Sequence, residues 1–268
     1  KNWKTYEADF FFFFQLCQNS RIDSTHRICI AFMKDYGVRN DLRKLNLFCD
    51  NFLKLNKNID NDALERRIKT ILLTNTSRLK QFSDGDINQK FKQLFTEFYK
   101  NNDYSAALEC FYEKAMLLNR KKQYHEVLKI LYFCEKFAVK NNLQNDLCYQ
   151  RILHEIAYKL LNFDQYSLSI NYFKKAIATK NCDAMDQLIA LNAIGIGYQK
   201  LNKLDQSNSY LQQASTLALK EKNQTFNAII NGNIGLNKFN LGRFNEAKKY
   251  IDLDKKVSLK YKIYPNAI

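Results

Sequence analysis

The first hundred residues alternate between polar stretches and stripes of apolar residues at three- and four-residue steps. Such stripes predict amphipathic α-helices over 24–35, 41–56, 62–82 and 87–99. The polar run Ser83–Asp86 interrupts the pattern and predicts a loop there. The chain has one proline and seven glycines, fewer than turn-rich β folds need. We therefore predict an all-α protein with short polar loops.

A period appears after residue 100. Residues 191–207 align with residues 231–247, so that Gly195 matches Gly235 and Ser207 matches Ala247 at an offset of 40. The pattern extends backwards through Ala157 and Ala115, and the steps from Ala115 onwards are 42, 38 and 40 residues. A fixed period of this size indicates stacked repeats.

Each repeat is expected to be a pair of antiparallel helices joined by a turn such as Leu201–Lys203. Its small residues let the two helix backbones approach, while large residues such as Tyr198 fill the space around that contact. One pair cannot bury its apolar faces alone, so stacking is required. The predicted repeat positions are Ala115, Ala157, Gly195, Tyr198, Ser207, Gly235 and Ala247.

These segments resemble the tetratricopeptide repeat. The likeness lies in Asn233-Ile234-Gly235 of the first helix and in Arg243–Ala247, which ends on Glu-Ala, at the start of the second. It covers about residues 105 to 260, with units near 40 residues instead of the family's 34. It implies a right-handed α-solenoid of helix pairs. Longer units of this kind are typical of regulatory arrays that bind peptides or proteins, including those ahead of bacterial sensor histidine kinases.

The expected organisation has three parts. Residues 1–22 form a poorly defined segment, residues 23–100 a helical region in which degenerate repeats are one interpretation, and residues 101–264 the repeats. Pro265 follows the last helix, which is expected to stop near Lys262 without a polar capping helix after it.

The net charge of +15 raises the question of nucleic acid. Lysine is abundant together with asparagine, isoleucine and phenylalanine, as an AT-rich coding sequence produces, and the basic pairs are dispersed along the chain. A solvated basic surface is therefore the preferred interpretation, and nucleic acid is an unlikely partner.

The seven cysteines form no CxxC pair and favour small buried apolar residues in a reducing compartment. We expect a cytoplasmic protein with no membrane span, since the longest apolar run is Phe10–Phe14. If residues 1–17 are the remnant of a signal peptide, a periplasmic or extracytoplasmic sensor is the alternative.

Catalytic chemistry has little support in the sequence. The three histidines have no assignable triad partners, and metal-ligand spacings such as HxxxH or CxxC are missing. The GxG at Gly195–Gly197 lies inside a repeat helix and lacks the third glycine of a dinucleotide loop. We expect no enzyme activity, no cofactor and no metal.

The repeat register does suggest a binding face. In tetratricopeptide arrays the first helix of each pair lines a concave surface, and here it would present polar and aromatic side chains that suit an extended peptide. The candidates are Arg151, His154, Tyr158, Asn192, Gln199 and Asn233. Ordinary contacts between repeats are the competing interpretation. The family's carboxylate clamp for acidic tails is matched only at Asn233.

The leading hypothesis is a scaffold that binds a protein or peptide, as the sensory or regulatory part of a bacterial signalling protein. The alternative is a peptide-responsive transcription regulator, similar to pheromone-receptor arrays, with a helix-turn-helix within residues 20 to 60. The second predicted helix there is apolar along much of its length, which disfavours this alternative.

Overall fold

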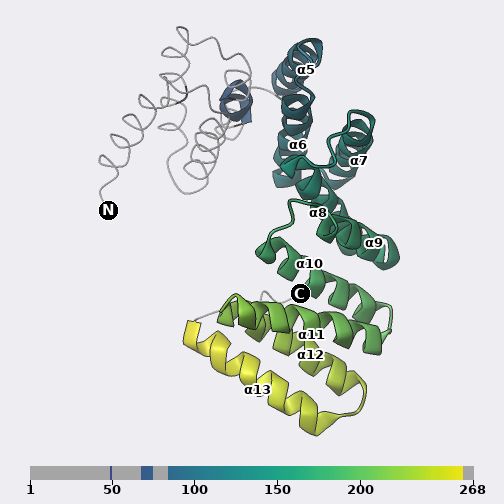
Figure 1. The fold of residues 1–268 in the computed structure, drawn as a ribbon, viewed down its shortest axis with the longest axis vertical. Helices are drawn as coiled ribbons and strands as arrows, with labels where there is room; N and C mark the ends of the chain where they lie inside the picture. The colour runs from purple at the N-terminus through teal and green to yellow at the C-terminus, as the bar shows by residue number, and fades with distance from the viewer. Residues whose placement is uncertain (1–48, 50–67, 75–83, 262–268) are drawn as a thin grey trace, which may run out of the picture. The chain divides into compact units, whose positions relative to one another are not determined.

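A computed structural model describes residues 49, 68–74 and 84–261 of the chain, and the described residues are helices joined by short connections (Figure 1). Residues 68–74 are helical, with Ile68 and Ile71 buried. The expected helices within 24–56 lie outside the described residues apart from Cys49. The remaining helices are α5 (Asp84–Lys100), α6 (Tyr104–Arg120), α7 (Tyr124–Lys140), α8 (Leu147–Asn162), α9 (Tyr166–Ile177), α10 (Ala184–Lys200), α11 (Leu204–Lys220), α12 (Gln224–Asn240) and α13 (Phe244–Tyr261).

The chain divides into two compact units, Lys1–Ile130 and Leu131–Ile268, with the division inside α7. In the first unit α5 packs on α6, and in the second consecutive helices from α8 to α13 pack on one another. α5 begins at Asp84, so the predicted loop at Ser83–Asp86 is wrong for its last three residues. Acidic residues favour the positive end of a helix dipole, which explains why they start α5 instead of preceding it.

The connections show why the repeats fold as helix pairs. Each short turn places one residue in the left-handed region of backbone space, and Lys122, Asp164, Asn202 and Gly242 do so at steps of 42, 38 and 40 residues. These steps equal those predicted from the small residues. After α10 the backbone N–H groups of Asn202 and Lys203 bond the carbonyls of Gln199 and Tyr198, both at 2.9 Å, which ends the helix with its carbonyls satisfied.

The small repeat positions lie where the two helices of a pair touch. A Cβ on Gly195 would come within 2.6 Å of Leu211, and one on Gly235 within 2.9 Å of Ile251. The hydroxyl of Ser207 donates to the carbonyl oxygen of Gly195 at 2.7 Å, and Ser169 donates to Ala157 in the same way at 2.8 Å. The close approach that the sequence predicted is therefore also held by hydrogen bonds that it did not predict.

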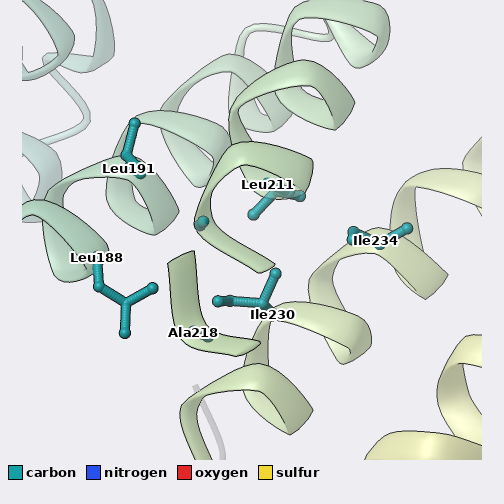
Figure 2. Close-up of a cluster of buried hydrophobic side chains, with 7 residues drawn as sticks. Leu188, Leu191, Leu211, Ala218, Ile230 and Ile234 are labelled. Carbon is teal, nitrogen blue, oxygen red and sulfur yellow. The ribbon is translucent and has the colours of Figure 1, made fainter. Parts of the chain in front are cut away.

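The core continues from one pair to the next. Figure 2 shows the cluster between α10, α11 and α12, where every member is buried. Its residues are Leu188, Leu191, Leu211, Ala214, Ala218, Ile230 and Ile234. Because α11 contributes to contacts on both sides, neither pair could bury its apolar surface alone.

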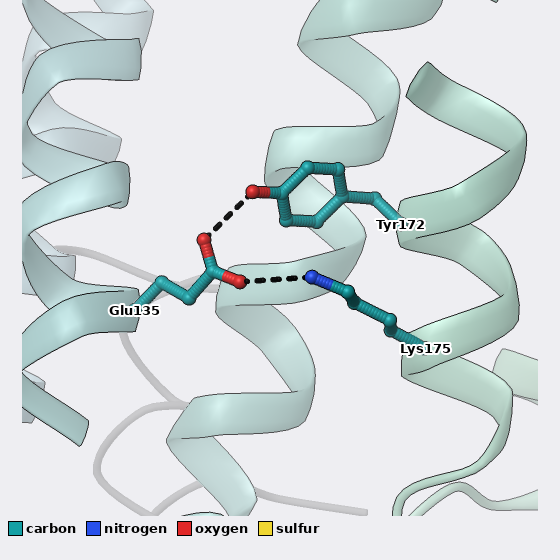
Figure 3. Close-up of polar contacts among 3 residues, drawn as sticks. All are labelled: Glu135, Tyr172 and Lys175. Atoms are coloured by element: carbon teal, nitrogen blue, oxygen red, sulfur yellow. Dashed lines mark hydrogen bonds and ion pairs between the residues drawn. The ribbon is translucent and has the colours of Figure 1, made fainter. Parts of the chain in front are cut away.

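A polar contact links α7 to α9 (Figure 3). Glu135 accepts a hydrogen bond from the Tyr172 hydroxyl at 2.7 Å and pairs with Lys175 at 3.4 Å. The Lys175 ammonium also lies 4.6 Å from the centroid of the Tyr172 ring. Burial, followed by the bond to Glu135, raises the pKa of Tyr172, so the phenol stays a proton donor.

Candidate functional site

The first helices of three consecutive pairs, α8, α10 and α12, carry all six residues predicted to bind a ligand. The surface formed by these helices is called the first-helix face below. Its side chains fall into two groups, the amides on α10 and α12 and the rings of His154 and Tyr158 on α8, while Arg151 stands apart from both. Among the described residues no hydrogen bond joins the two groups.

The amides of α10 and α12 are bonded to each other. Asn233 Nδ2 donates to Asn192 Oδ1 at 2.9 Å. Gln199 Nε2 lies 3.4 Å from the Asn233 carbonyl oxygen and 2.5 Å from Asn237 Oδ1. Three predicted residues are therefore brought together, and they form contacts between neighbouring repeats. These bonds fix the position of α12 against α10.

Asn237 is the residue that the prediction missed. It is fully buried, and its Nδ2 donates to Ser207 Oγ at 2.7 Å and to Asn208 Oδ1 at 3.1 Å. It thereby connects the amides to α11. The repeat alignment matches Asn237 with Gly197, which is also buried. A polar residue at a buried repeat position was therefore the signal that could have identified Asn237.

The amide side chains use only part of their hydrogen-bonding capacity within the described residues. An asparagine or glutamine side chain offers two N–H donors and a carbonyl oxygen. Among the described residues the half-buried Asn233 side chain makes one hydrogen bond, through one N–H, and the Gln199 carbonyl oxygen makes none. Donors and acceptors therefore remain for a peptide backbone.

On α8, His154 and Tyr158 pack around Phe173 of α9. Ring centroids are 5.4 Å apart for His154 and Phe173 and 5.1 Å apart for Tyr158 and Phe173. Burial raises the pKa of Tyr158 to about 12, with a smaller contribution from the carboxylates of Glu155 and Asp186. Burial lowers the pKa of His154, against the opposing charge of Asp186. The imidazole is therefore neutral near pH 7.

Two side chains of α8 hold buried polar atoms without partners. His154 Nε2 and both amide atoms of Gln150, one turn earlier, have no hydrogen-bond partner among the described residues. Gln150 is 1% exposed and stands where the next two pairs have the buried residues Leu188 and Ala228. An unpaired buried polar group costs about 1–3 kcal/mol, so a buried water molecule is the expected partner. Arg151 is exposed beside them and joins neither group.

Large apolar side chains continue the first-helix face along α12. Ile229, Leu236 and Phe239 lie on one side of that helix at spacings of seven and three residues and are exposed. Phe239 also contacts Phe244 edge to face, with ring centroids 5.4 Å apart. The amides are thus next to apolar side chains.

A separate cavity of about 810 Å³ lies along α5 and α6 in the first unit. Buried Phe91 and Cys110 form part of its apolar wall, together with Phe95 and Phe111, and Lys92 and Lys114 are its basic members. Burial raises the pKa of Cys110 to about 12, so its thiol is protonated and not a reactive thiolate.

Within the described ranges, no cluster of three or more His, Cys, Asp or Glu side chains is arranged to hold a metal ion. None of the described helices is both long enough and apolar enough to cross a membrane.

Comparison with known proteins identifies the fold. No protein-family model and no curated protein matches the sequence. Among solved structures, BtubC from P. vanneervenii is 13% identical, with a TM-score of 0.69 over 85% of this chain and 96% of that one. The apo form of RapI is 11% identical, with a TM-score of 0.66 over 88% of this chain and 66% of that one.

A third solved structure is a signal-transduction ATPase from Pyrococcus horikoshii with a tetratricopeptide repeat sensor. It is 16% identical, with a TM-score of 0.68 over 91% of this chain and 37% of that one. The chain therefore has the all-α solenoid fold of tetratricopeptide-repeat proteins, as its sequence predicted.

Proposed function

We propose that this chain is a scaffold that binds a peptide segment of another protein on its first-helix face, as the sensory or regulatory part of a bacterial signalling protein. The observation that carries the proposal is the row of partly used amides beside exposed Leu236 and Phe239. Amides can pair with a peptide backbone, while apolar side chains of the peptide cover the exposed leucine and phenylalanine.

One comparison also supports the proposal. One similar structure contains a tetratricopeptide repeat sensor within a signal-transduction ATPase, which supports a regulatory role. The transcription-regulator alternative depends on residues 20 to 60, which lie outside the described residues except for Cys49.

The proposed ligand differs from the acidic tails held by a carboxylate clamp. Asn192 and Ile196 stand where such a clamp needs a lysine and an asparagine, and the nearby Lys238 is already paired with Glu246 at 2.8 Å. The peptide should therefore be apolar and close to neutral where it meets α10 and α12.

The test selects ligands from a displayed library of random 12-residue peptides against the full chain. For the selected peptides, the double variant Leu236→Ser/Phe239→Ser should raise Kd by about tenfold or more, because two exposed apolar anchors are lost. Leu219→Ser on α11 is the matched control, since Leu219 is at least as exposed but lies on a second helix of a pair.

Peptides that bind the double variant and the control equally well would rule out the first-helix face as the binding site. A selection that yields no neutral apolar peptides would count against the proposed ligand class. An Asn233→Ala variant separates the two parts of the site, because it removes an amide and leaves the apolar anchors.

A further inference from the structure

The last described helix, α13, repeats the sequence positions of α11 at an offset of 40 residues. α11 uses one of its faces to hold the following helix, α12. Leu211 is 0% exposed on that face, Asn208 accepts a hydrogen bond from Asn237 at 3.1 Å, and Ser215 donates one to Asn227 at 2.8 Å. Two polar contacts therefore flank an apolar one.

No described helix covers the equivalent face of α13. Ile251 takes the place of Leu211, packs on Gly235 of α12 and is still 45% exposed. Lys248 and Lys255 take the places of Asn208 and Ser215, and both are exposed. Neither ammonium has an ion pair or a hydrogen bond within the described part of the chain. The surface formed by Lys248, Ile251 and Lys255 is called the α13 face below.

We propose that the α13 face binds an amphipathic helix of a partner protein that carries acidic side chains at the positions where α12 has Asn227 and Asn237. A helix seated on α13 as α12 is seated on α11 would bring those two positions next to the two lysines. Charge complementarity then favours Asp or Glu at both. The apolar positions of Ile230 and Ile234 lie between them.

The required pattern is an acidic residue, apolar residues three and seven positions later, and a second acidic residue at ten. A second copy of α13 fits less well. In an antiparallel pair centred on Ile251, Lys248 of one helix would face Lys255 of the other, and like charges repel. The α13 face thus resembles the surface of α11 that holds α12, but two lysine ammonium groups stand where α11 has neutral hydrogen-bonding side chains.

The test uses two labelled synthetic peptides with the α12 sequence and alanine at Gly232 and Gly235, to raise helicity. One contains Asn227→Glu and Asn237→Glu, and the other has lysine at both positions. Their binding to the full chain is measured by fluorescence anisotropy at low salt. The acidic peptide should bind about tenfold more tightly, the effect expected of two exposed ion pairs.

Charge exchange in the protein provides the decisive control. The double variant Lys248→Glu/Lys255→Glu should reverse the preference, so that the lysine peptide binds better. The variant Lys249→Glu/Lys256→Glu changes the net charge equally but on positions that do not face the bound helix, and it should keep the original preference. Equal binding of both peptides, no binding, or reversal by the Lys249/Lys256 variant would overturn the proposal. Sedimentation that shows the chain pairing through α13 would overturn it as well.

Discussion

Replacing Gly195 by alanine tests how the helix pairs are held together. Gly195 lies in the interior of α10, where α11 approaches most closely. A Cβ at this position would be 2.6 Å from Leu211 Cγ and 2.7 Å from Leu211 Cδ2. Leu211 is fully buried in the cluster between α10, α11 and α12, so its branch has no open space to move into.

Two effects of opposite sign determine the result. Alanine in place of glycine favours a helix interior by roughly 1 kcal/mol. Forcing an extra methyl group into a packed core costs about 1–3 kcal/mol. A contact this short demands displacement of α11 or of Leu211, which places the packing cost in the upper part of that range, at about 2–3 kcal/mol. We therefore expect Gly195→Ala to lower the free energy of unfolding by about 1–2 kcal/mol.

Gly232 provides a control with the same chemistry and a different neighbour. A Cβ there would also come within 2.6 Å of another atom, but that atom is Oδ2 at the end of the Asp254 side chain. This half-buried carboxylate can rotate away, at the expense of its 2.9 Å bond from Ser258. Gly232→Ala should therefore be neutral, or stabilising by less than about 1 kcal/mol.

The measurement is urea unfolding of both variants followed by far-ultraviolet circular dichroism. A lower midpoint for Gly195→Ala, with Gly232→Ala at or above the wild type, is the expected result. Equal midpoints for Gly195→Ala and wild type would refute the reasoning, because they would mean that α10 and α11 separate freely at this contact.

Three further predictions concern stability. Asn237→Ala leaves the partners of a buried amide unpaired, so it should lower the free energy of unfolding, measured in urea, by about 1–3 kcal/mol. Asn240 is exposed, and Asn240→Ala should change that free energy by less than about 0.5 kcal/mol. Similar losses in both variants would contradict the role of Asn237. Lys222 has a φ of 53°, which glycine adopts without strain, so Lys222→Gly should raise the thermal midpoint by an amount equivalent to about 1 kcal/mol; a lower midpoint would refute this. Burial lowers the pKa of His154 in the folded chain below its ordinary 6.5. As the pH falls below 6.5, the unfolded chain therefore binds a proton at His154 before the folded chain does, and the stability present above pH 6.5 is lost. The difference in urea midpoint between pH 7.5 and 5.5 should shrink in His154→Phe, and an unchanged difference would show that His154 does not titrate in this way.

The sequence predicted most of the proposed site without predicting what its residues do. Asn192, Gln199 and Asn233 were found from their places in the first helix of each pair. Their mutual hydrogen bonds depend on the rotation of α12 against α10, which a single helix pattern does not contain. Asn237 was missed because the pattern treats its position only as the equivalent of Gly197.

The sequence by itself determined the helices, their pairing and the period, because apolar spacing and small residues act locally and repeat. The steps of 42, 38 and 40 residues between small positions recur in the turns. Only the tertiary structure decided which polar atoms pair across repeats, that Gln150 and His154 keep unpaired atoms, and that α13 leaves Ile251 exposed between two lysines. Burial and hydrogen bonding depend on what the neighbouring helix places opposite each side chain, and that follows from the packing of the whole array.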